Sequence, residues 1–195
     1  MLKKHVEDAQ SVYSSQTPVT HKKIEQISLE EVETIALEAH KGQVDKLGVD
    51  YIEHPRAVAK LVELVPSYKS LSLGERWLAV ASAYLHDVIE DTAVTAADLH
   101  NSGLPMEALY VIRDLTRKKE IPSDQYYATI LKSTVARVVK IADMAHNADF
   151  DRLALLEEKT AIRLRKKYSK GIVLITQGYP EDLEWFKAQT KLEVK

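Results

Sequence analysis

The segment LHDVIEDT, residues 85–92, places acids and an imidazole among apolar residues. The side chains of His86, Asp87, Glu90 and Asp91 can each bind a metal ion or move a proton. Most of the other residues are apolar and suit the buried face of a helix. The polar groups are therefore either charges at a helix end that face water, or groups that converge on something bound inside the protein.

Helix geometry favours the second alternative. In a continuous helix His86 lies one turn before Glu90, and Asp87 one turn before Asp91, because residues four apart share a face. Carboxylates at the C-terminal end of a helix are unfavourable, since that end carries a partial negative charge. No lysine or arginine occurs from residue 77 to residue 112, so the segment supplies no compensating cation of its own. A bound divalent metal ion is the simplest compensation.

Two distant residues complete a candidate metal site. His54 stands at the start of an apolar helical pattern, and Asp143 interrupts a helix that is otherwise apolar on that side. Together with His86 and Asp87 they make two imidazoles and two carboxylates. Without a thiolate, that set suits Mn²⁺, Fe²⁺ or Mg²⁺ better than structural zinc. Four protein ligands also leave positions open for water and a phosphate oxygen.

A divalent ion with open positions can polarise a phosphoryl group and lower the pKa of a water molecule. Glu90 and Asp91 follow the ligands by one helical turn and are expected to orient that water or move its proton. Asn147 follows Asp143 by one turn, and its amide is expected to hold substrate or water. The pattern therefore predicts a metal-dependent hydrolase of phosphate compounds.

The composition limits the class of protein. The 195 residues include no cysteine, which excludes disulfides, thiolate nucleophiles and cysteine-based metal sites. The formal net charge is −2, and the basic residues from 163 to 170 are interpreted as a charged helix face, so we expect no nucleic-acid partner. No apolar run approaches the ~18 residues of a membrane span, and we expect a cytoplasmic protein without a membrane partner. Nothing in the sequence indicates the oligomeric state.

Helical signals fill the chain after a polar N-terminal extension, residues 1–27. Residues 28–195 are predicted to form a single all-α domain, with at most a small hairpin near Val49–Ile52. Capping boxes at Ser28 and Ser72 predict two helix starts. We expect helices to begin near Leu29, Pro55, Leu73, Thr95, Pro105, Ser123, Thr134, Leu155 and Pro180. The third is expected to continue into the segment 85–92. Pro55 is expected at the first helical position, and Ser123 and Thr134 are expected to cap their helices.

The order of these residues resembles the metal-binding set of the HD-domain phosphohydrolases. The surrounding blocks are similar to the hydrolase domain of RelA/SpoT proteins and to the single-domain small alarmone hydrolases. These blocks are Ala39–Gln43, Tyr51–Pro55, Leu85–Thr92, Lys140–Asp143 and the pair His146-Asn147. The resemblance covers about residues 30 to 175. A single His-Asp dipeptide carries little information, whereas four ordered blocks are specific.

The resemblance implies an all-helical fold, a Mn²⁺ ion and removal of pyrophosphate from the 3′ position of ppGpp. It implies four metal ligands, namely His54, His86, Asp87 and Asp143. It also implies that Glu90 and Asp91 form the catalytic acidic pair and that Asn147 positions substrate and water. Iron, magnesium or another divalent metal remains an alternative to manganese.

One stretch departs from the family pattern. After Gly42-Gln43 the alarmone hydrolases usually carry Arg-Lys-Ser-Gly, whereas this chain has Val-Asp-Lys-Leu-Gly at positions 44–48. Lys46 is therefore expected to contact a phosphate as a point charge. Asp45 stands at the arginine position, and a reversed charge there is expected to weaken a nucleotide contact. In the later helix, Leu164 stands at the place of a family arginine four residues before Tyr168.

Several alternatives remain open at this stage. The same chemistry is compatible with a hydrolase that acts on a different small nucleotide or phosphate ester. A catalytically silent module that binds a nucleotide would also retain the pocket. His40 and His146 are equally compatible with packing in the core and with a supporting role at the site. Arg117 is equally compatible with a position in the pocket and with one on the surface.

Overall fold

Helices make up nearly all the regular structure of residues 27–194, the part of the chain that the computed structural model describes. The predicted extension lies outside this part, apart from Ile27. The helices are α1 (Leu29–Ala39), α2 (Glu53–Val62), η1 (Pro66–Ser70, a 3₁₀ helix), α3 (Leu73–Leu85), α4 (Val88–Asp91), α5 (Ala96–Asn101), α6 (Met106–Leu115), α7 (Ser123–Ile130), α8 (Thr134–Asn147), α9 (Phe150–Ala154), α10 (Glu158–Ile175) and α11 (Pro180–Thr190). The all-α prediction is confirmed. In place of a hairpin, the described residues contain a single antiparallel bridge, between Val44 and Asp50.

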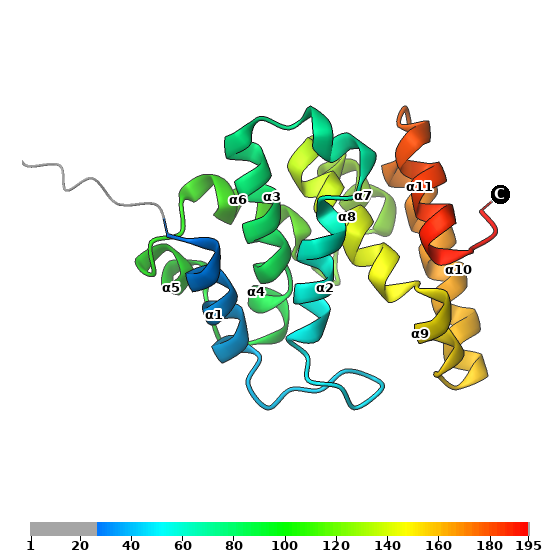
Figure 1. Cartoon of the computed structure of the whole chain (residues 1–195), viewed down its shortest axis with the longest axis horizontal. Helices are drawn as coiled ribbons and strands as arrows, with labels where there is room; N and C mark the ends of the chain where they lie inside the picture. The colour runs from blue at the N-terminus through cyan, green and yellow to red at the C-terminus, as the bar shows by residue number, and fades with distance from the viewer. Residues whose placement is uncertain (1–26, 195) are drawn as a thin grey trace, which may run out of the picture.

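Helices α2, α3 and α8 form the centre of the bundle. Helix α2 packs on both α3 and α8, α1 and α6 pack on α3, and α10 and α11 lie against α8 on one side (Figure 1). Helix α8 is almost entirely buried, with Val138, Val139 and Ile141 fully inside the larger core cluster. The loop between α1 and α2 lies at one end of the bundle. None of the described helices is long and apolar enough to cross a membrane.

Local side-chain hydrogen bonds fix several helix starts. The capping boxes at Ser28 and Ser72 are present, and each serine hydroxyl accepts a bond from the third backbone amide of its helix. Thr95 and Asp98 form a third such box at α5. Pro180 stands in the first turn of α11, where a missing amide proton costs nothing. These short-range signals predicted the starts correctly.

The predicted continuous helix through residues 85–92 is wrong. Helix α3 ends at Leu85, His86 is its C-cap, and α4 begins at Val88 with Asp87 as its N-cap residue. In a continuous helix, neighbouring side chains point about 100° apart. The break frees His86 and Asp87 from that divergence, so both can face the same point.

Other boundaries also differ from the prediction. Pro55 is the third residue of α2 rather than the first, and Ser123 is the first residue of α7 rather than its cap. Ser133, not Thr134, caps α8 through its hydroxyl. Each of these errors moves a boundary by only one or two residues.

The predicted helix from Leu155 begins three residues later in the structure, and an unpredicted helix stands before it. A short helix, α9, precedes it and is capped by the Asp149 side chain, which accepts a bond from Arg152 N. Helix α10 then begins at Glu158. The signal for α9 was a lone Asp cap ahead of five residues, too short a segment for hydrophobic periodicity to reveal.

Candidate metal centre and pocket

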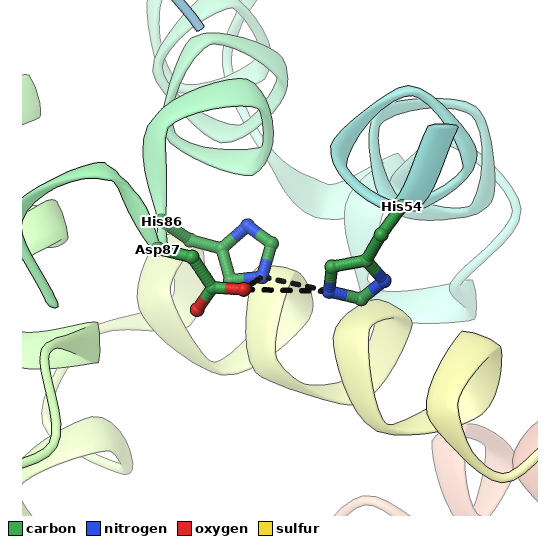
Figure 2. A group of neighbouring side chains, drawn as sticks. All are labelled: His54, His86 and Asp87. Carbon is green, nitrogen blue, oxygen red and sulfur yellow. Dashed lines mark hydrogen bonds and ion pairs between the residues drawn. The ribbon is translucent and has the colours of Figure 1, made fainter. Parts of the chain in front are cut away.

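Three separate parts of the bundle bring the four predicted metal-binding residues together. His54 comes from the first turn of α2, His86 and Asp87 from the break between α3 and α4, and Asp143 from the buried face of α8. Figure 2 shows His86 and Asp87 pointing across the gap toward His54. The Nε2 atoms of the two histidines are 3.2 Å apart.

The donor atoms are spaced as a divalent ion requires. Asp87 Oδ2 lies 3.1 Å from His86 Nε2 and 3.5 Å from His54 Nε2. Asp143 Oδ1 lies 3.3 Å from His54 Nε2 and 3.7 Å from His86 Nε2. Ligands about 2.1 Å from one ion are roughly 3.0 to 3.4 Å apart in octahedral or tetrahedral arrangements. The residues therefore fit a divalent metal ion.

Hydrogen bonds on the far ring nitrogens prepare the histidines as ligands. His86 Nδ1 lies 2.8 Å from the Ala83 carbonyl oxygen, which can only accept, so this nitrogen carries the proton. With a metal ion bound, the neutral His86 ring would direct its Nε2 lone pair at that ion. His54 Nδ1 lies 2.8 Å from His146 Nδ1, so His146 supports His54 rather than joining the donor cluster. Two imidazole Nε2 atoms and two carboxylates thus converge on one point, where either a metal ion or a protonated His86 balances the carboxylate charge.

Burial and charge act against each other at this centre. Burial by itself lowers the pKa of His86, but the carboxylates of Asp87 and Asp143 outweigh it and raise that pKa to about 10. Burial likewise raises the pKa of Asp143, yet Lys140 and the two histidines hold it well below its usual value. Lys140 Nζ donates to Asp143 Oδ2 at 2.7 Å. The carboxylates therefore stay ionised, which a metal ligand requires.

Two neutral side chains hold the carboxylate ligands from outside. Tyr51 Oη donates to Asp87 Oδ2 at 2.7 Å and lies 3.2 Å from Asp91 Oδ2. Asn147 Nδ2 donates to Asp143 Oδ1 at 2.6 Å. Asn147 thus engages Asp143 through its amide nitrogen, while its carbonyl oxygen is available to a ligand of the cavity.

The acidic pair lies beside this centre on α4. Glu90 Oε2 accepts a bond from the backbone amide of Arg117 at 2.7 Å. The pKa of Glu90 is raised, first by burial and then by the nearby charges of Asp87 and Asp91, against the lowering effect of that hydrogen bond. Gln43 Nε2 donates to the Asp91 carbonyl oxygen, which ties the loop before α2 to the end of α4.

The cluster opens into a cavity of about 850 Å³. His54, Asp87, Glu90, Asp91, Asp143 and Asn147 all contribute to its lining. Its basic lining residues are Lys46, Arg117, Lys140, Arg152, Lys167 and Lys170. A metal-binding cluster beside several cations is an arrangement suited to a ligand with more than one phosphate group.

The structure shows how the Asp45 carboxylate is paired, while its effect on a nucleotide contact stays a prediction. Asp45 Oδ1 accepts bonds from the Leu47 and Val49 amides, and Asp45 Oδ2 pairs with Arg152 at 2.7 Å. The carboxylate is therefore fully engaged by its own loop and by a cation. Lys46, the next residue, lines the cavity, and its contact with a phosphate stays a prediction.

Some site residues escaped the sequence analysis. Tyr51 stands three residues before His54, and Lys140 three before Asp143, which is the spacing of neighbours on one helix face. That spacing is the signal that would have revealed Lys140. Arg152 had no comparable signal, because its partner Asp45 is far away in the sequence. The role of His40 was left open by the sequence. In the structure His40 Nδ1 lies 2.8 Å from Gln43 Oε1.

The fold and the site define an all-helical protein with a buried cluster of histidines and aspartates suited to a divalent metal. The sequence matches the HD domain family over residues 51–148, which is half of the chain. The chain therefore belongs to the HD-domain family, in agreement with the resemblance noted in its motifs.

Individual relatives are similar over the same region. The chain is 32% identical over 127 residues to the bifunctional (p)ppGpp synthase/hydrolase SpoT of Escherichia coli, covering 58% of this chain and 16% of that protein. It is 45% identical over 123 residues to a guanosine-3′,5′-bis(diphosphate) 3′-pyrophosphohydrolase of Haemophilus influenzae, covering 58% and 17%. The chain thus spans about a sixth of the length of these relatives.

A solved structure confirms the fold. The structure of a metazoan ortholog of SpoT that hydrolyses ppGpp superposes with a TM-score of 0.64. The alignment covers 85% of this chain and 96% of that one, at 18% sequence identity. The two proteins therefore share a fold although fewer than one residue in five is identical.

Proposed function

We propose that this protein is a Mn²⁺-dependent phosphohydrolase that removes pyrophosphate from the 3′ position of guanosine 3′,5′-bis(diphosphate) and leaves GDP. The observation that carries the proposal is the cluster of His54, His86 and Asp87 with Asp143 beside it, which opens into a cavity lined by basic side chains. The relatives in Escherichia coli and Haemophilus influenzae carry names for this chemistry, which supports the choice of substrate.

The donor set determines which ion the site would hold. The proposed ligands are His54, His86, Asp87 and Asp143. Imidazole and carboxylate without thiolate suit Mn²⁺, with Fe²⁺ or Mg²⁺ as alternatives. When bound, such an ion supplies polarisation of a phosphoryl oxygen and a lowered pKa for a water molecule. Lys140 and Tyr51 would keep the two carboxylate ligands ionised and oriented.

Glu90 and Asp91 are the proposed catalytic carboxylates. Hydrolysis forms a bond between a water oxygen and the phosphorus at the 3′ position, and breaks the bond from that phosphorus to the 3′ oxygen. The attacking water must lose a proton, and a carboxylate whose pKa is raised toward neutrality accepts it more readily. Asn147 is proposed to hold substrate or water through its free carbonyl oxygen, and Lys46 to contact a phosphate.

The test is a hydrolysis assay with Mn²⁺ and ppGpp, with nucleotides separated by anion-exchange chromatography. We expect GDP and pyrophosphate with metal and intact ppGpp after chelation. Glu90→Gln is expected to lower kcat by about 100-fold or more, because it removes a proton acceptor and little volume. Glu107→Gln, in the first turn of α6, is the matched control. Full activity in Glu90→Gln would exclude Glu90 from the chemistry.

A hydrolase for a different nucleotide or phosphate ester is the second candidate. The observation that favours it is Asp45, which stands where the alarmone hydrolases usually carry an arginine. In that case the assay leaves ppGpp intact, and other nucleotides and phosphate esters are turned over with the same metal dependence. A module that only binds nucleotides would instead bind ppGpp without forming product.

A further inference from the structure

The Asp45 side chain is fixed by three contacts. Its Oδ1 atom accepts from Leu47 N at 2.7 Å and from Val49 N at 3.0 Å, and its Oδ2 atom lies 2.7 Å from Arg152 Nη2. The side chain is only 7% exposed. The contacts outweigh the effect of burial and hold the pKa of Asp45 below its usual value. Asp45 is therefore a fixed anion that forms an ion pair with the Arg152 guanidinium.

Arg152 crosses from α9 to reach this anion. Its side chain is 21% exposed, lines the cavity and is linked to the loop before α2 by the ion pair. A guanidinium has five N–H donors in a planar fork. Among residues 27–194, Arg152 forms an ion pair only with Asp45, through Nη2. The other donors are therefore available to a ligand in the cavity.

Arg152 lines the same cavity as His54, Asp87 and Asp143. Lys46 follows Asp45 directly and lines that cavity as well. A fixed guanidinium and a second cation thus face the cavity into which the four-donor cluster opens.

We propose that Arg152 binds a phosphate group of the substrate and that Asp45 is the residue that positions it. This inference rests on the proposed function and deepens it by naming a specificity-determining contact. Arginine suits the task because its fork matches two phosphate oxygens at once. The acid at position 45 thus recruits a cation from α9, where the related hydrolases carry the cation in the loop itself.

A rigid ion pair with a merely structural role is the competing explanation. Such a pair would affect the folding midpoint when either member is removed, and would leave KM unchanged. A phosphate contact would affect KM and would depend on the shape of the cation as well as on its charge. The variants Arg152→Met, Arg152→Lys and Asp45→Asn separate these cases. Arg113→Met, in an exposed pair with Asp114 outside the cavity lining, is the matched control.

The experiment measures kcat and KM for ppGpp hydrolysis with Mn²⁺, and ppGpp binding by calorimetry, in the full chain. We expect Arg152→Met to raise KM and Kd by about 10-fold or more, as expected for loss of hydrogen bonds to a charged group. Arg152→Lys should recover part of this loss. Asp45→Asn, which keeps an acceptor for the loop amides, should raise KM about 3-fold, within the range of a paired charge. The double variant should match Arg152→Met alone, because Asp45 acts only through Arg152.

Each outcome is decisive. Wild-type protein that hydrolyses ppGpp together with an Arg152→Met protein of unchanged KM overturns the phosphate contact and leaves the proposed function standing. Wild-type protein that binds ppGpp without product overturns the proposed function, and the Kd of Arg152→Met then still decides the contact. Wild-type protein that neither binds nor hydrolyses ppGpp overturns both. An equal effect of Arg113→Met would also overturn the contact.

Discussion

Tyr51 shows how one neutral residue can control a charged centre. Its hydroxyl donates to Asp87 Oδ2, the same oxygen that faces both histidines. Groups that orient metal ligands typically contribute 10- to 100-fold in metal affinity or activity. We expect Tyr51→Phe to lower metal affinity by about 10-fold with little loss of stability, because the ring remains. The check is titration of Mn²⁺ against activity.

The control for Tyr51 is Tyr110→Phe, since Tyr110 is half exposed on α6 and outside the cavity lining. Unchanged Mn²⁺ dependence in Tyr51→Phe would contradict an orienting role. In that case the position of Asp87 would depend on the backbone break before α4 alone.

Asp45 predicts a pH dependence of stability. Its folded-state pKa is lowered, since the Val49 and Leu47 amides and Arg152 outweigh the effect of burial. A lowered folded pKa contributes stability above the unfolded pKa, about 3.9, and loses it as pH falls through the folded pKa. We therefore expect Asp45→Asn to melt below wild type at pH 7, and the two melting temperatures to converge below about pH 4.

The pH comparison is made by thermal denaturation from pH 3 to pH 8, with Asp114→Asn, a partly exposed acid outside the cavity lining, as the control. A difference between wild type and Asp45→Asn that stays constant down to pH 3 would show that the charge of Asp45 is unimportant to the fold. The amide bonds of its loop would then account for the whole effect.

At the scale of elements, α10 depends on a glycine for its close approach. A Cβ at Gly171 would meet Tyr127 Oη at 2.5 Å and Met144 Cε at 2.9 Å. Such overpacking typically costs about 1 to 3 kcal/mol. We expect Gly171→Ala to lower the melting temperature by several degrees, and to lower activity because Met144 is adjacent to Asp143. Gly74→Ala, where a Cβ meets nothing within 4 Å, should instead be neutral or stabilising.

The outcome for α10 is read from melting curves of both glycine variants. A Gly171→Ala protein as stable as Gly74→Ala would show that α7 and α8 yield easily to a methyl group. The opposite signs expected for the two variants separate the close contact from the general effect of alanine on helix propensity.

The elements also show which features the sequence could predict. The starts of α1, α3 and α5 depend on contacts within four residues, so Ser28, Ser72 and Thr95 revealed them. The four donor residues were predicted because imidazole or acid in an apolar pattern is unusual. The break after His86 was missed, since the residues around it are ordinary helix formers and its cause lies in packing. The Asp45–Arg152 pair joins distant segments, and local pattern carries no information about such a pair.

At the scale of the whole molecule, a buried ion pair joins α8 to α11. Arg137 on α8 is fully buried and pairs with Asp182 on α11, which also accepts two bonds from Ser67 in η1. Within residues 27–194, two guanidinium nitrogens of Arg137 find no hydrogen-bond partner, and the guanidinium carbon lies 3.3 Å from the centroid of the Tyr179 ring. Stacking on that ring compensates part of the desolvation. Arg137 thereby fixes α8 to α11 on a different face of α8 from the one that carries Asp143.

The metal ion would join the remaining parts of the bundle. The proposed ligands come from α2, the break between α3 and α4, and α8, so bound metal stabilises only the folded arrangement of all three. An ion at 100 times its Kd adds about 2.7 kcal/mol, or roughly 5 to 10 °C in melting temperature for a chain of this size. We expect this rise with Mn²⁺ and its reversal by a chelator. Asp143→Asn should abolish the rise, whereas Asp114→Asn should retain it. A rise of equal size in Asp143→Asn would mean that the ion binds elsewhere, and the four-donor cluster would then lose its proposed role.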